Sequence, residues 1–192
     1  MITRLKLSTI EQGLPKYRSM LAGNSAYVPP SYESIASATG TGSSGTITFS
    51  SIPGTYQHLQ IRINSRNDST DGATTTMRFN GDTGSNYARH YLYGDGATVS
   101  ASGNATTTSM WVQAGGGNTT YPTVAIIDIH NYASTSQYKT QRVFSGMDSN
   151  SATGWAQLSS GLWMSTSAIT SITITQSYNY SISATFALYG IK

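Results

Sequence analysis

The chain lacks, or has few of, the residues that carry most protein chemistry. It contains no cysteine among its 192 residues, so it can form neither disulfide bonds nor thiolate metal sites. Only 10% of the residues are charged, and three are histidine, which leaves few groups for acid–base catalysis or metal binding. The folded state must therefore depend on packing and on hydrogen bonds between strands.

Long apolar segments are also missing. No run approaches the ~18 apolar residues that a membrane-spanning helix needs, and residues 1–7 (MITRLKL) lack the apolar stretch of a signal peptide. We therefore expect a soluble protein that is made in the cytoplasm and has no membrane partner.

The common catalytic motifs are absent from the sequence. It has no Gly-x-Ser-x-Gly, no phosphate-binding glycine loop and no His-Glu-x-x-His, and its eight acidic residues form no recognisable pair for glycoside hydrolysis. These absences predict a protein that is not an enzyme, with no catalytic residue, no cofactor and no bound metal.

What the sequence does contain favours β-structure. Serine and threonine together outnumber all charged residues, and tyrosine and glycine are abundant. Polar and apolar residues alternate without a fault over residues 58–64, which is the period of a strand with one buried face. Similar short runs predict strands at 32–38, 46–49, 75–80, 88–93, 107–113, 123–130, 138–147, 155–158, 169–175 and 183–191.

Strands that recur about every ten residues, with turn residues between them, predict a single all-β sandwich or barrel over residues 32–192. The glycine-rich segments 100–108 and 115–120 are interpreted as exposed loop tips. Residues 124–129 are apolar on both faces, which predicts a central strand or a strand with one face covered by another subunit. The alternation places these residues in the core: Ile47, Phe49, Leu59, Ile61, Ile63, Ile126, Phe186 and Leu188.

Residues 1–31 differ from the rest of the chain and predict an extended N-terminal arm. Gly13 and Pro15 would break any helix there, and the pair at 29–30 is Pro-Pro. This segment has four basic residues and one acidic residue, so it carries all of the net charge of +3. We expect it to dock on an acidic protein surface through the following basic and apolar side chains: Arg4, Leu5, Lys6, Leu7, Ile10, Leu14, Lys16, Tyr17, Arg18, Met20 and Leu21.

Nucleic acid is not an expected partner, because the folded domain shows no basic stripe with interleaved aromatic residues. Asp128 and His130 are two residues apart and would share one face of a strand, where a hydrogen-bonded structural pair is favoured over a metal or acid–base site. Asp82 and Asp95 lie in glycine turns, where a turn role is favoured over calcium binding. The three tryptophans at 111, 155 and 163 are expected in the core or an interface rather than in a sugar-stacking surface.

Several segments resemble small virion proteins of tailed bacteriophages, including cyanophages. They are residues 14–24 (LPKYRSMLAGN), 49–62 (FSSIPGTYQHLQIR), 78–82 (RFNGD), 160–163 (SGLW) and 186–192 (FALYGIK). The resemblance implies a jelly-roll-like sandwich, a homotrimer and a place in the virion, assembled in the host cytoplasm. Family members usually carry an acidic residue where this chain has Asn131, which further disfavours a metal site there.

Three roles follow. The first is a capsid decoration, or cement, protein that docks through its arm on the major capsid protein or another virion protein. The alternative is a tail-fibre or spike module that binds host-surface carbohydrate, which predicts aromatic residues on loop tips. An enzyme acting on the host envelope is the third, and it would need convergent carboxylates.

Overall fold

A computed structural model describes residues 31–69, 73–113, 118–149 and 154–192, and within these ranges the chain forms strands and no helix. This confirms the all-β class. The strands are β1 (Tyr32–Thr39), β2 (Thr46–Phe49), β3 (His58–Ser65), β4 (Thr75–Phe79), β5 (Tyr87–Gly94), β6 (Val99–Thr107), β7 (Met110–Gln113), β8 (Thr123–His130), β9 (Lys139–Asp148), β10 (Gly154–Trp163), β11 (Ile172–Thr175) and β12 (Thr185–Ile191).

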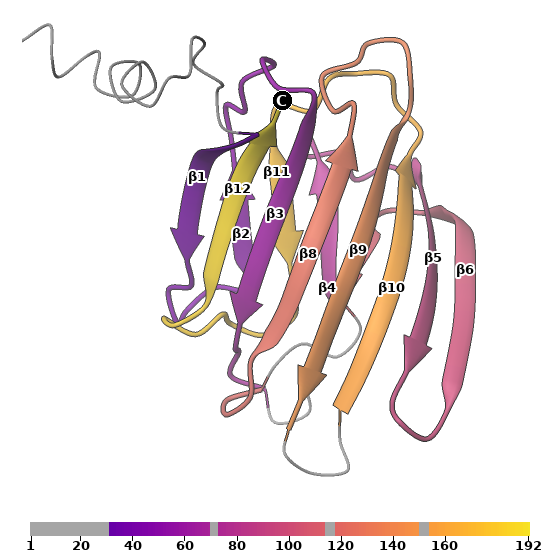
Figure 1. Cartoon of the computed structure of the whole chain (residues 1–192). Helices are drawn as coiled ribbons and strands as arrows, with labels where there is room; N and C mark the ends of the chain where they lie inside the picture. The colour runs from indigo at the N-terminus through magenta and orange to yellow at the C-terminus, as the bar shows by residue number, and fades with distance from the viewer. Residues whose placement is uncertain (1–30, 70–72, 114–117, 150–153) are drawn as a thin grey trace, which may run out of the picture. The chain divides into compact units, whose positions relative to one another are not determined.

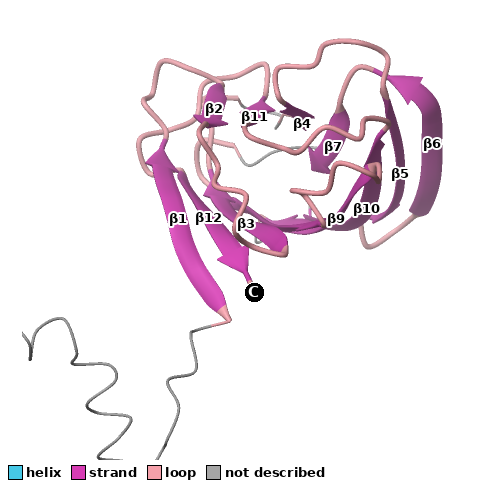
Figure 2. Cartoon of the chain, turned by 90° about the horizontal axis from the view of Figure 1, so that it is seen from above, coloured by secondary structure: helices cyan, strands magenta, loops and turns pink. Residues whose placement is uncertain are grey.

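The strands form two antiparallel sheets that face one another. The large sheet has eight strands in the order β1-β12-β3-β8-β9-β10-β5-β6, and the small sheet has four in the order β2-β11-β4-β7. Figure 1 shows the large sheet in front of the small one, and Figure 2 shows the two layers from above.

The strand order is that of a jelly roll with four strands added to one sheet. In the orders β1-β12-β3-β8 and β2-β11-β4-β7, strands β1 to β4 alternate between the two sheets, and so do β7, β8, β11 and β12, as in two interlocked Greek keys. Strands β9, β10, β5 and β6 then extend the large sheet beyond β8. We call β1, β12, β3 and β8 the jelly-roll half of the large sheet, and β9, β10, β5 and β6 the added half.

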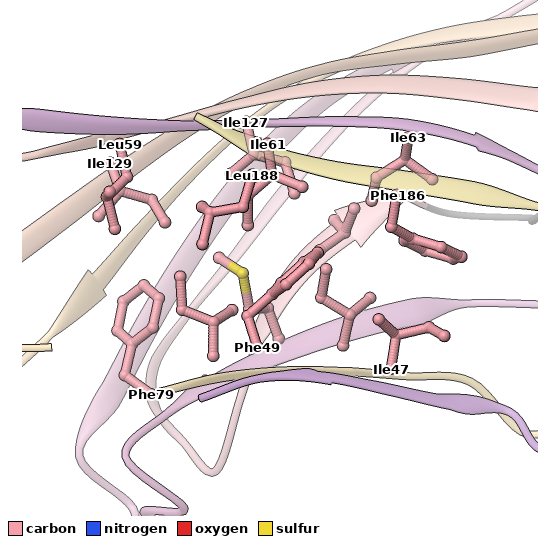
Figure 3. Close-up of a cluster of buried hydrophobic side chains, with 14 of the residues drawn as sticks. Ile47, Phe49, Leu59, Ile61, Ile63, Phe79, Ile127, Ile129, Phe186 and Leu188 are labelled. Carbon is pink, nitrogen blue, oxygen red and sulfur yellow. The ribbon is translucent and has the colours of Figure 1, made fainter. Parts of the chain in front are cut away.

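The main core lies between the jelly-roll half and the small sheet. Side chains from both sheets point toward one another, as Figure 3 shows for Leu59 and Ile127 above and Phe49 and Phe79 below. Seven of the eight predicted core residues are buried there: Ile47, Phe49, Leu59, Ile61, Ile63, Phe186 and Leu188.

The prediction for Ile126 was wrong. Its side chain is 45% exposed, because Ala125, Ile127 and Ile129 occupy the inward positions of β8 and strand alternation turns Ile126 outward. The prediction of a central strand is confirmed, since β8 lies between β3 and β9.

The prediction of a loop at residues 100–108 was also wrong. Strand β6 covers most of this segment and pairs with β5 through a tight turn. Asp95 holds that turn, because its Oδ1 accepts hydrogen bonds from the backbone N–H groups of Ala97 (2.9 Å) and Thr98 (2.7 Å). The single strand expected at 107–113 is instead the end of β6 and the whole of β7. The small, polar residues of β6 look like a loop in sequence because both faces of this strand are exposed.

Candidate functional site

The residues proposed for the docking arm all lie between Arg4 and Leu21, and this segment is outside the described residues. The candidate sites that can be judged are on the sandwich. No helix that could cross a membrane occurs among the residues described.

Asp128 and His130 share one face of β8, as expected, but their partners are on neighbouring strands. Asp128 accepts hydrogen bonds from Gln60 Nε2 on β3 (2.9 Å) and from Arg142 Nη2 on β9 (3.1 Å). The centroid of the His130 ring lies 4.8 Å from that of the His58 ring. The pKa of His58 is lowered, first by its burial and second by the charge of His130 beside it. Within the described ranges no group of three or more His, Asp or Glu could hold a metal ion.

The two aspartates in glycine turns act as turn and anchor residues. Asp82 Oδ1 accepts from the backbone N–H of Gly84 (2.8 Å), and its Oδ2 accepts from the indole Nε1 of the buried Trp163 (2.7 Å). The hydrogen bond from Trp163 is the largest cause that lowers the pKa of Asp82. This contact joins the β4–β5 connection to the end of β10.

All three tryptophans lie on strands. Trp155 and Trp163 are buried, and Trp111 on β7 is half-buried, in contact with two residues of β5. The Arg89 guanidinium lies 4.4 Å from the centre of the Trp111 ring, and the Tyr91 ring lies 4.5 Å from it. Trp155 and Trp163 are thus buried within the sandwich, and Trp111 packs against β5 of the same chain.

The outer face of the large sheet carries a row of exposed apolar side chains. Ile126, Phe144, Leu158 and Leu92 are partners in register on the adjacent strands β8, β9, β10 and β5. They are 45%, 58%, 50% and 49% exposed, respectively. We call this row the apolar ridge. Isolated exposed apolar residues are common, and a contiguous row of large ones makes this face the candidate contact surface of the described chain.

A row of small side chains runs beside the ridge, two residues along each strand. Gly146, Ala156 and Gly94 are in register on β9, β10 and β5, and Val124 continues the row on β8. We call the first three the small-residue trough. Because alternate residues of a strand are about 6.6 Å apart on one face, ridge and trough lie side by side.

The side of the added half that faces the small sheet is unusually polar. Gln141, Ser145, Gln157 and Ser159 are buried on it. Lys139 is also buried, its Nζ donates to the backbone carbonyl of Gln137 (2.7 Å), and burial lowers its pKa. The added half therefore buries polar side chains next to the apolar Val143, Tyr87 and Trp163, and it exposes Phe144, Leu158 and Leu92 on its outer side.

This surface is only partly predictable from the sequence. Residues 124–129 are apolar on both faces, which predicts a central strand or a strand with one face covered by another subunit. Phe144 and Leu158 carry no such signal, because each is a lone large apolar residue among polar neighbours. Only the pairing of β8, β9, β10 and β5 brings them into one row.

Comparisons of the chain with protein-family models, with curated proteins and with solved structures found no match. The resemblance to phage virion proteins therefore stays a prediction from the sequence. What the described structure defines is a jelly-roll sandwich with an extended sheet whose outer face carries the apolar ridge.

Proposed function

We propose that this chain is a non-enzymatic structural subunit of a tailed-bacteriophage particle, most specifically a capsid decoration protein that docks through its N-terminal arm and associates with copies of itself. The observation that carries the assembly role is the apolar ridge, because four large side chains in register are costly to leave in water. The sequence resemblance supports the placement in a virion and implies a homotrimer.

The charge distribution supports the role of the arm. Residues 1–31 hold the whole net charge of +3, so the sandwich is neutral and the arm is suited to an acidic surface of the major capsid protein or another virion protein. Charge alone does not offset the cost of ordering a chain, about 1–2 kcal/mol per residue. Apolar anchors such as Leu5, Leu14 and Met20 would supply the rest, about 1.5–3 kcal/mol for each one fully buried.

The test is reconstitution on particles that lack the protein. The chain without residues 1–24 should remain folded and soluble but fail to bind particles. A second variant, in which Arg4, Lys6, Lys16 and Arg18 are replaced by glutamine, should bind more weakly and with less dependence on salt. Full decoration by the truncated protein would show that the arm is not the tether.

A tail-fibre module that binds host carbohydrate is the competing function. The three tryptophans lie on strands rather than on loop tips, which does not favour it. Copy number separates the two roles, since symmetry requires hundreds of copies for a shell protein and few for a fibre. A count of tens or fewer per particle would favour the fibre.

A further inference from the structure

The apolar ridge and the small-residue trough fit a surface that is complementary to itself. Consider a two-fold axis that runs across the strands, parallel to both rows and midway between them. Rotation about this axis turns the face over and moves each ridge residue onto the residue two positions away on the same strand, which is a trough residue on β9, β10 and β5 and Val124 on β8. Phe144 then lies over Gly146 of the other copy, and Leu158 over Ala156.

The size of the face also suits a second copy. At a strand spacing of about 4.8 Å and a rise of about 3.3 Å per residue, a sheet of eight strands, each about eight residues long, has a face of roughly 900 Å². A stable interface buries about 800 Å² on each partner. Two sheets that pack face to face are held about 10 Å apart, the distance at which large side chains fill the space above small ones.

The charges on this face disfavour the arm as the occupant. This face carries two carboxylates, Asp128 and Asp148, and two guanidinium groups, Arg62 and Arg142, of which Arg142 is paired with Asp128. An arm of charge +3 would therefore meet no net negative charge there. A second copy brings no such excess, because the sandwich as a whole is neutral.

We infer that two copies of this chain pair through the outer faces of their large sheets, with the ridge of each copy seated in the trough of the other. This inference rests on the proposed role as an assembly subunit and names the partner of its apolar face. The contact has two-fold symmetry, so it makes dimers when alone, and hexamers when combined with the expected trimer contact.

The experiment measures the mass of the purified full-length chain by light scattering over a range of concentrations. The wild type should be a dimer or hexamer. Leu158→Ser should raise the dissociation constant of the two-fold contact by more than about tenfold, because each contact contains the substitution twice. Ile182→Ser, at a loop residue that is 78% exposed, is the matched control and should change nothing.

Ala156→Phe provides the sharper discrimination. It enlarges the exposed apolar area but fills the trough, and phenylalanine is well suited to a strand, so the fold should persist, as circular dichroism can verify. Ridge-in-trough packing predicts weaker pairing, whereas association driven by apolar area alone predicts stronger pairing. The inference is overturned if Ala156→Phe pairs more strongly than the wild type, or if the wild type is a monomer or a trimer. Either result would leave the proposed binding of the arm to particles unaffected.

Discussion

The two halves of the large sheet differ in the polarity of their inner sides. The jelly-roll half places Leu59, Ile127 and Leu188 toward the small sheet and turns Arg62 outward, although Ile126 of β8 also faces outward. The added half buries polar residues such as Gln141 and turns Phe144 outward. A sandwich needs an apolar interior to fold, and the jelly-roll half supplies it.

The difference lies in where the large apolar side chains are. Most of those on the jelly-roll half are buried in the core, whereas Phe144, Leu158 and Leu92 of the added half are about half exposed in the described chain. The following substitutions test this difference between the halves. The expected change in the free energy of unfolding depends on the half in which each substitution lies.

The largest effect is expected in the core of the jelly-roll half. Phe186 is almost fully buried and packs edge-on against Tyr180, with ring centroids 4.8 Å apart. Phe186→Ala should lower the free energy of unfolding by about 3–5 kcal/mol, through lost burial and the cavity left behind. Urea unfolding measures this, and a loss below 1 kcal/mol would place the folding core elsewhere.

A smaller loss is expected where the added half is anchored. Asp82→Ala removes the acceptor of the Trp163 indole N–H, which should cost about 1–3 kcal/mol of unfolding free energy. Because the folded-state pKa of Asp82 is lowered, its contribution is present above the unfolded value of about 3.9 and is lost as pH falls through the folded pKa.

Unfolding of the Asp82→Ala variant should therefore depend less on pH below about 4 than that of the wild type. Asp82→Asn, which keeps an acceptor oxygen without the charge, is the matched control. If the free energy of unfolding varied with pH below about 4 in the same way for the wild type and Asp82→Ala, the stabilising role of the Asp82 carboxylate would be contradicted.

A gain in stability is expected inside the added half. The Ser145 hydroxyl is buried and has no hydrogen-bond partner among the described residues. Ser145→Ala should raise the free energy of unfolding by about 1 kcal/mol, because it removes an unpaired polar group at almost no change in volume. Thermal and urea unfolding should agree on the sign, and a loss of stability would refute the prediction.

The smallest effect is expected on the ridge. Leu92 is half-exposed in a single copy, so Leu92→Ser should change unfolding by no more than about 0.5 kcal/mol at concentrations where the chain is monomeric. A large change in the monomer would mean that the ridge already packs within one copy.

The sequence predicted the parts of the fold that follow from local alternation. Strands such as 46–49, 58–64 and 123–130 were placed almost to the residue, because each has one buried face with period two. It failed for Ile126, where both faces of the strand are apolar and alternation cannot choose between them. It also missed β6, whose small residues carry no periodic signal.

The candidate surface was harder to predict than the fold. The ridge depends on which strands are neighbours, and β10 pairs with β5 although they are distant in sequence. Pairing over such distances is decided by tertiary packing, which short-range patterns do not encode. The arm residues, in contrast, were proposed from charge and hydropathy alone and stay predictions.

Strand β6 ends the large sheet with an edge that is open to solvent. Within the described residues it pairs only with β5, all but the last of its nine residues are exposed, and it contains neither a charged residue nor a proline. Natural sheets usually blunt such edges with lysine, proline or a covering loop, because an unpaired edge can recruit strands from other chains. Aggregation during expression should therefore begin at this edge, and a lysine at the exposed Ser102 is the simplest way to suppress it.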